Sequence, residues 1–166
     1  MKNSNSNQYR DINYYEIYFG TRHQQVVISK DGEMKISQYG QWDGDLSGQG
    51  LDILRYLKTG NLEKYQENLS KICEITELQT KEIEADNDWV QNYPYLTRNC
   101  GSNIHKMIEM GEVKFVSFIS NEEAKSWCVG FYTIDFSKNT FTSQYCDIEK
   151  TYSLDNLPSE DEYLKE

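Results

Sequence analysis

An Asp-Gly pair between two strand-like runs is the feature that most constrains the fold of this chain. β-Branched apolar residues precede Asp31-Gly32, and residues that alternate between polar and apolar follow it, as in a tight β-hairpin. A glycine-rich segment comes next, at residues 40–50, and then leucines recur at helical spacing as far as Gly60. The sequence therefore predicts a hairpin over 22–39, then a loop, then a helix.

Two further helices and three further strands are expected downstream. Asn61 can cap a helix whose apolar stripe includes Tyr65 and Leu69, and a third helix lies between Ser102 and Gly111. The hydrophobic patterns predict strands at 113–119, 127–136 and 140–145. This order of elements predicts an α+β domain, with a mixed, mainly antiparallel sheet and about three helices packed on it.

The length of 166 residues indicates one domain with two distinct ends. We expect residues 1–19 to form a partly disordered N-terminal arm, residues 20–150 to form the α+β domain, and residues 151–166 to form a mobile acidic tail. The aromatic run at 9–19 offers apolar surface that one copy alone does not cover, so we expect a homo-oligomer.

Charge and composition exclude several classes of protein. The 27 acidic and 17 basic residues give a net charge of −10, which disfavours general nucleic-acid binding. The chain has no apolar run of the roughly 18 residues that a membrane span needs. Four cysteines without a C-x-x-C pair, and an N-terminus without an apolar signal core, indicate a cytoplasmic protein with reduced thiols. The two histidines, His23 and His105, lie far apart without a ligand cluster, so we expect neither a metal nor a cofactor.

The segment at 38–50, Gln-Tyr-Gly-Gln-Trp-Asp-Gly-Asp-Leu-Ser-Gly-Gln-Gly, is the candidate functional site. Its glycines permit close approach of backbone to a ligand, and the helix start after Gly50 favours anions. The glycine spacing matches neither dinucleotide folds nor P-loops. Aromatic rings in the loop can stack on a base, and nearby arginines can bind phosphate or carboxylate. The candidate ligand-binding residues are Thr21, Arg22, Gln41, Trp42, Asp43, Gln49 and Arg98.

A purely structural interpretation of these residues stays open. In that interpretation Tyr39 and Trp42 anchor the core, and Asp43 and Ser47 bond loop amides, as turn-forming residues commonly do. Cys100 is the better nucleophile candidate among the cysteines, because a helix start would lower the pKa of its thiol. Buried, inert thiols are the alternative.

Gly20-Thr21-Arg22 and the segment 38–50 together resemble an uncharacterised family found in phages, bacteria and some fungi. Its members show a Gly-Thr-Arg start, a hairpin and a QYGQWDGYPSGQG-like segment; Asp45 and Leu46 replace the usual Tyr-Pro here. Segments beginning at residues 93 and 127 also resemble family motifs, although Val129 stands where the family usually has an acidic residue.

The same start is similar to that of N-terminal-nucleophile (Ntn) hydrolases, in which Thr21 would be the nucleophile. This likeness implies an Ntn-hydrolase-like form of the α+β fold. Twenty residues precede Thr21, so we expect no free α-amine to activate its hydroxyl.

Three functions follow as hypotheses. The first is a small-ligand-binding protein, a phage anti-defence protein that sequesters a nucleotide-derived immune signal in the host cytoplasm. The second is a hydrolase of an amide, glycosidic or phosphoester bond that uses Thr21, Cys100 or Asp43. The third is an acidic inhibitor of a basic partner protein.

Overall fold

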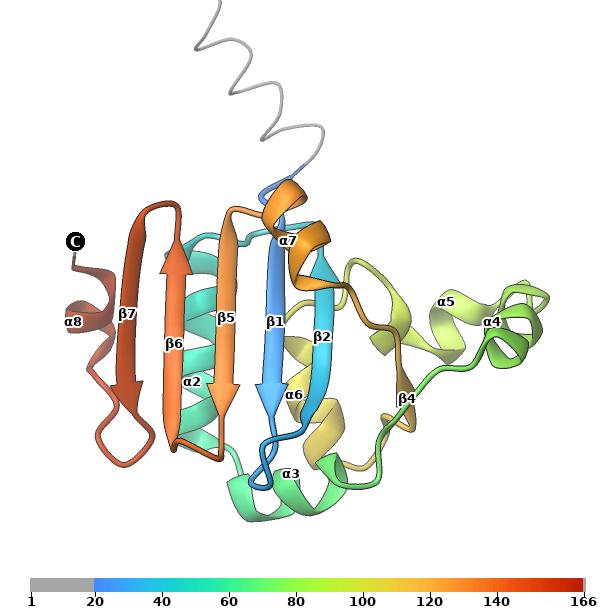
Figure 1. Ribbon diagram of the computed structural model, residues 1–166, viewed down its shortest axis with the longest axis horizontal. Coiled ribbons are helices and arrows are strands. Elements are labelled where there is room, and N and C mark those ends of the chain that lie inside the picture. Colours follow the sequence, from blue (N-terminus) through green and yellow to red (C-terminus); the bar gives the residue numbers. More distant parts are fainter. Residues whose placement is uncertain (1–19, 166) are drawn as a thin grey trace, which may run out of the picture.

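The computed structural model describes residues 20–165, which form a mixed five-stranded sheet backed by helices (Figure 1). The strands lie in the order β2-β1-β5-β6-β7; β1 and β5 are parallel, and the other neighbouring pairs are antiparallel. The predicted α+β class with a mainly antiparallel sheet is confirmed. The predicted arm at 1–19 lies outside the described residues. The five strands are β1 (His23–Ile28), β2 (Met34–Gly40), β5 (Gly130–Asp135), β6 (Thr140–Tyr145) and β7 (Ile148–Ser153).

Three helices match the predicted ones: α2 (Leu51–Thr59), α3 (Leu62–Leu69) and α6 (Asn103–Glu109). In Figure 1, α2 and α6 lie behind the sheet, and α3 lies at its lower end. Within residues 20–165 there are seven α-helices, so the prediction of about three was too low. The other four are α4 (Glu77–Glu84), α5 (Trp89–Asn92), α7 (Asn121–Trp127) and α8 (Glu160–Leu164). Each of them is short or largely exposed, and so leaves little apolar periodicity in the sequence.

Short elements complete the chain. The turn η1 (Leu46–Gly50) leads from the glycine-rich loop into α2, and η2 (Pro94–Leu96) precedes α6. A separate two-stranded sheet pairs β3 (Cys73–Glu74) with β4 (Phe115–Val116) in parallel. The strand predicted at 113–119 is therefore much shorter than expected.

The hairpin of β1 and β2 turns at the predicted pair. The Gly32 amide donates to the Ser29 carbonyl at 2.9 Å, and the Ser29 amide donates to the Glu33 carbonyl at 2.8 Å. Gly32 has a φ of +88°, a conformation that side chains other than glycine rarely adopt. The hairpin predicted over 22–39 is confirmed.

One row of apolar side chains crosses the sheet and forms the centre of the core. The strand register places Ile36 opposite Val27, Val27 opposite Ile134, and Ile134 opposite Phe141. Each of these side chains is at most 2% exposed. Burying each one contributes roughly 1.5–3 kcal/mol relative to exposure, so the row fixes which face of the sheet meets the helices.

The prediction of a strand over 127–136 was wrong at its start, because Trp127 ends α7. The Ser120 hydroxyl caps this helix by accepting the Glu123 amide at 3.1 Å. Only Ala124 of α7 is buried, so the helix has no apolar stripe from which it could be predicted.

The predicted mobile tail at 151–166 was also wrong. Strand β7 crosses the proposed domain boundary at residue 150, and α8 returns to the domain. Tyr163 of α8 is fully buried, and its hydroxyl lies 2.6 Å from the Ser143 hydroxyl. A single aromatic anchor thus holds an otherwise acidic segment against the sheet.

Candidate functional site

The glycine-rich loop bonds the amides before α2 to its own carbonyls. The Gln49 amide donates to the Asp43 carbonyl at 2.7 Å, and the Gly50 amide donates to the Asp45 carbonyl at 3.4 Å. Amides that are already bonded offer nothing to a ligand. The amides of Gln49 and Gly50 are therefore not available to the anion expected at the start of the helix.

The loop glycines allow the protein to pack against itself. A Cβ atom at Gly44 would lie 2.5 Å from the Thr21 carbonyl oxygen, to which the Gly44 amide donates at 2.9 Å. A Cβ atom at Gly50 would lie 2.3 Å from the Tyr163 hydroxyl oxygen. Close approach at these two positions therefore serves the chain's own atoms.

Gln49, one of the predicted site residues, forms hydrogen bonds to other parts of the protein. Its amide nitrogen donates to the Trp42 carbonyl at 3.3 Å, and its oxygen accepts the Ser102 amide at 2.7 Å. The side chain thus joins the loop to the residues just before α6. Thr21 likewise acts through its carbonyl, and the exposed Asp43 adopts a φ of +56° while its carbonyl accepts Gln49.

The loop and the segment before α6 are joined directly, which brings several predicted residues together. The Gln41 amide donates to the Arg98 carbonyl at 2.9 Å, and the Trp42 indole donates to the Asn99 side-chain oxygen at 2.7 Å. The Tyr39 hydroxyl donates to the Gln41 side-chain oxygen at 2.5 Å. Trp42 is 39% exposed, so its ring is available to a ligand although its indole nitrogen is bonded.

Two positive charges act on this region. Burial raises the pKa of Tyr39, and the charges of Arg22 and Arg98 act on it in the opposite direction. Trp127 meets the Tyr39 ring edge-on, with the ring centres 6.3 Å apart, and is 53% exposed. Trp127 was missed as a site residue because the sequence placed it in a strand, away from any loop.

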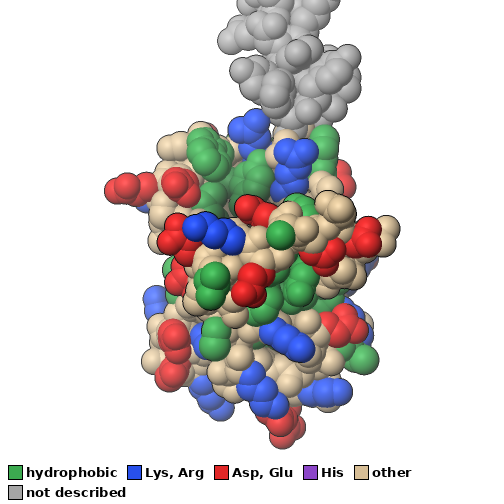
Figure 2. Space-filling view, turned by 90° about the vertical axis from the view of Figure 1, so that its right-hand side faces the viewer, with side chains coloured by type: hydrophobic (Ala, Val, Ile, Leu, Met, Phe, Trp, Pro, Cys, Tyr) green, Lys and Arg blue, Asp and Glu red, His purple; other side chains and the backbone are tan. Residues whose placement is uncertain are grey.

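A hollow of about 200 Å³ lies beside this cluster, between β2 and two segments that follow η2 and β4. Figure 2 shows this side of the molecule, where hydrophobic side chains gather with Lys or Arg side chains next to the grey residues. None of the residues that line the hollow is acidic, although the chain carries a net charge of −10. The lining residues are Gln38, Tyr39, Tyr95, Leu96, Thr97, Arg98, Val116, Ser117, Phe118 and Ile119.

Gln38 lines the hollow and is incompletely bonded. Its amide nitrogen donates to the Tyr95 carbonyl at 3.0 Å, but its buried Oε1 has no hydrogen-bond partner among residues 20–165. Buried acceptors are nearly always paired in proteins, with protein, water or ligand. Sequence reasoning missed Gln38 as a lining residue, because that role follows only from β2 being at the edge of the sheet.

A larger hollow, of about 550 Å³, lies between the hairpin turn and α3. Its lining mixes the lysines Lys30 and Lys35 with four carboxylates, which favours a solvated surface over one type of charged ligand. The four carboxylates belong to Asp31, Glu33, Glu63 and Glu67.

Both histidines belong to one buried chain of polar groups behind the sheet. Tyr65 and His105 are joined at 2.9 Å, His105 and Gln25 at 2.6 Å, and Gln25 and His23 at 3.5 Å. Burial lowers the pKa of His23 to about 4 and that of His105 to about 3. Both rings are therefore neutral at pH 7 and are closed to an external ligand.

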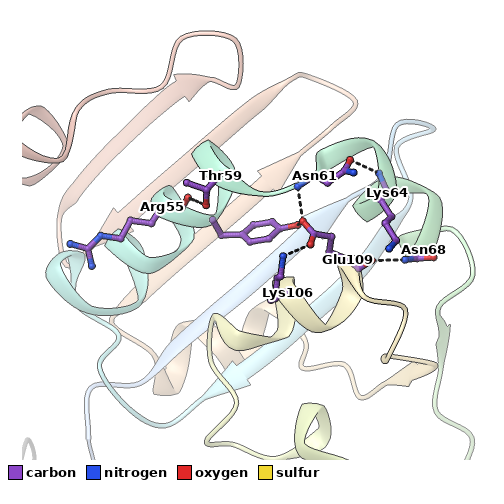
Figure 3. A network of polar contacts seen from close by, with 8 residues as sticks. Arg55, Thr59, Asn61, Lys64, Asn68, Lys106 and Glu109 are labelled. Carbon is purple, nitrogen blue, oxygen red and sulfur yellow. Dashed lines mark hydrogen bonds and ion pairs between the residues drawn. The ribbon is translucent and has the colours of Figure 1, made fainter.

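A second polar cluster surrounds Glu109 and links α2, α3 and α6 (Figure 3). Its carboxylate accepts the Asn61 amide at 2.5 Å and the Tyr56 hydroxyl at 3.3 Å, and it pairs with Lys106. Its carbonyl accepts the Asn68 side chain at 2.8 Å. The hydrogen bond from Lys106 is the main cause of the lowered pKa of Glu109. With its oxygens bonded to the protein, Glu109 serves to lock the helices.

The two buried cysteines, Cys100 and Cys128, are unsuited to nucleophilic attack. Burial raises the pKa of Cys100 and of Cys128 to about 11, so both thiols are protonated at pH 7. The expectation that a helix start lowers the pKa of Cys100 was wrong. Cys73 and Cys146 are exposed, and no disulfide joins cysteines within residues 20–165.

In the described part of the chain, no three His, Cys, Asp or Glu side chains are grouped so as to hold a metal ion. No helix of residues 20–165 is long and apolar enough to cross a membrane. No family model, curated protein or solved structure matches the chain.

Proposed function

We propose that this protein binds a small anionic ligand that carries a flat ring. The observation that carries the proposal is the hollow beside Arg98, which has no acidic lining residue in a strongly acidic chain. An anion meets repulsion over most surfaces of such a protein, so a region without carboxylates and with two arginines nearby is the favoured place for it.

Arg98 in the lining of the hollow and Trp42 on the neighbouring loop suit the two parts of such a ligand. Arg98 forms no ion pair with a carboxylate of residues 20–165, and its planar guanidinium can bind a phosphate or carboxylate through two hydrogen bonds. The exposed ring of Trp42 can stack on a heterocycle. About 200 Å³ is below the ~300–1,000 Å³ of sites that enclose a whole ligand, so the hollow takes one part and leaves the rest on the rim.

A nucleotide-derived immune signal is the proposed ligand class, and sequestration by a phage anti-defence protein in the host cytoplasm is the proposed role. The resemblance at residues 20–23 and 38–50 supports the phage origin. Binding without chemistry is supported by the protonated thiols of Cys100 and Cys128 and by the enclosure of both histidines in the core.

The two alternative functions, a hydrolase and an acidic inhibitor, predict different experimental results. A hydrolase of Ntn-like fold would use Thr21 or Asp43 beside the loop, and it would return a chemically altered ligand. An acidic inhibitor would bind a basic protein through exposed carboxylates and would be displaced by salt. The predicted homo-oligomer depends on residues 9–19, outside the described residues, and light scattering of the purified protein tests it.

Mass spectrometry of small molecules released by heat from the purified protein tests the binding proposal. We expect an intact anionic, ring-containing molecule from the wild type. The variants Trp42→Ala and Arg98→Ala should each bind it about tenfold or more weakly, because a charge-assisted hydrogen bond or a stacked ring is lost.

Arg55→Ala is the matched control, because Arg55 is an exposed arginine on α2 that pairs with Asp52 and Glu160 away from the hollow. If Trp42→Ala and Arg98→Ala retain everything that the control retains, the site is wrong. Recovery of a cleaved ligand would favour the hydrolase.

A further inference from the structure

The outer edge of β2 leaves one residue with unpaired backbone groups inside the hollow. The Ser37 carbonyl accepts the Ile119 amide at 2.9 Å, and the Gln41 amide donates to the Arg98 carbonyl at 2.9 Å, so both residues face outward. Because backbone groups alternate along a strand, Tyr39, which lies between them, faces outward too. Neither its amide nor its carbonyl has a hydrogen-bond partner among residues 20–165.

The unpaired edge of β2 at Tyr39 forms a gap one residue long, and this length decides which kind of ligand can bind there. A peptide that adds a strand to a sheet edge needs several consecutive backbone pairs. Here Ser37 and Gln41, on either side of Tyr39, are already bonded to segments of the same chain, so an added strand cannot extend past one residue. A small molecule with one hydrogen-bond acceptor next to one donor matches the gap.

We propose that the Tyr39 backbone pairs with the edge of a nucleobase inside the hollow, while Arg98 binds the phosphate of the same nucleotide. The Tyr39 amide donates to an acceptor of the base, and the Tyr39 carbonyl accepts from a ring N–H or an amino group. Nucleobases carry such neighbouring groups on their Watson–Crick edge. This inference rests on the proposed function and names the ligand class of that site.

The polar groups that line the hollow favour a nucleobase over an apolar ring as the ligand. Thr97 and Ser117, which carry hydroxyl groups, line the same space. A ring that hydrogen-bonds to Tyr39 would satisfy two backbone groups that the described residues leave unpaired. An apolar ring would leave both without a partner.

Calorimetric titration of the wild type with AMP, GMP, CMP and UMP tests the ligand side. The tightest binder is then compared with its analogue methylated at the Watson–Crick edge. We expect methylation to weaken binding about tenfold or more, because a two-bond contact to a base edge is lost. If Arg98→Ala weakens binding but methylation does not, the base contact is overturned and the anion site stands. Failure of all four nucleotides overturns the base contact, whereas the proposed function is decided by the molecule that heat releases from the wild type.

The variants Tyr39→Pro and Tyr39→Ala test the protein side. Both remove the ring, but only proline removes the outward N–H, which a strand edge tolerates because no partner strand uses it. We expect Tyr39→Pro to bind about tenfold more weakly than Tyr39→Ala. If Tyr39→Pro does not fold, nitrogen-15 NMR of the wild type replaces it, with a shift of the Tyr39 amide on titration expected. Equal affinities, or an unmoved amide, would overturn the proposal.

Discussion

Gly50 is a residue at which two effects act in opposite directions on an alanine substitution. Its backbone is helical, with a φ of −58°, so alanine would favour the helix by about 1 kcal/mol. The added Cβ would lie 2.3 Å from the Tyr163 hydroxyl and 2.7 Å from a Tyr132 ring carbon, both within the core. Overpacking of this kind costs roughly 1–3 kcal/mol, so we expect Gly50→Ala to lower the free energy of unfolding in urea.

A double-mutant cycle with Tyr163→Phe identifies the cause of that loss. Phenylalanine removes the oxygen nearest to the added Cβ, so Gly50→Ala should cost less in the Tyr163→Phe background than in the wild type. Equal costs in both backgrounds would contradict a clash with the hydroxyl and would leave Tyr132 as the cause.

Residue types alone suggested two members of the candidate site, whose binding role stays a prediction. Trp42 was chosen because its ring can stack on a base, and Arg98 because its planar guanidinium can bind an anion. The structure joins their segments through hydrogen bonds to Asn99 and to the Arg98 carbonyl. The structural use of Gly50 could not be predicted, because its contact partner lies far along the chain, in the segment predicted to be a mobile tail. Long-range packing of this kind leaves no local signal in the sequence.

At the scale of elements, prediction succeeded where a helix has a long apolar stripe. Helices α2, α3 and α6 bury several apolar residues each and were predicted. Helix α4 buries only Ile83, and its capping box at Thr76 is its clearest local signal. Elements stabilised by caps and single contacts were therefore the ones that sequence periodicity missed.

Helix α8 tests this dependence on caps and a few contacts. Five residues are too few for an independent helix, so α8 depends on the Ser159 cap, the pair of Arg55 with Glu160, and buried Tyr163. Deletion of residues 159–166 should cost about 3–5 kcal/mol of unfolding free energy, the usual cost of removing a buried aromatic side chain.

Leu164→Ala is the control for that deletion, because Leu164 is 39% exposed and should change the same chemical-denaturation midpoint only slightly. An unchanged midpoint in the deletion variant would mean that α8 does not stabilise the domain.

At the scale of the whole molecule, one long-range pairing determines where the hollow lies. The sequence predicted the β1–β2 hairpin from its turn, and it predicted strands over 127–136 and 140–145, where β5 and β6 lie. It could not predict that β1 and β5 pair in parallel and so leave β2 at an edge. The exposed edge at Tyr39 follows from that pairing, which is why the hollow beside it had no signal in the sequence.

The buried histidines make the stability of the whole molecule depend on pH. His23 and His105 stay neutral in the folded protein until the pH falls to about 4 and about 3, whereas each binds a proton near pH 6.5 when unfolded. Their contribution to stability is therefore complete above pH 6.5 and is lost as the pH falls towards 4 and then 3. Between pH 7 and pH 5 we expect the free energy of unfolding to fall by about 2 kcal/mol for each histidine.

Urea unfolding at pH 5, 6 and 7 measures this slope, in a range where most carboxylates contribute little because they titrate near pH 4. His105→Gln lowers stability at every pH because it disturbs the contacts with Tyr65 and Gln25, but it should also halve the change between pH 7 and pH 5. The pH dependence of stability is thus separated from the loss of contacts, which lowers stability at every pH. A wild-type free energy that is flat over this range would mean that the folded protein opens to protonate its histidines, and the buried polar chain behind the sheet would then be wrong.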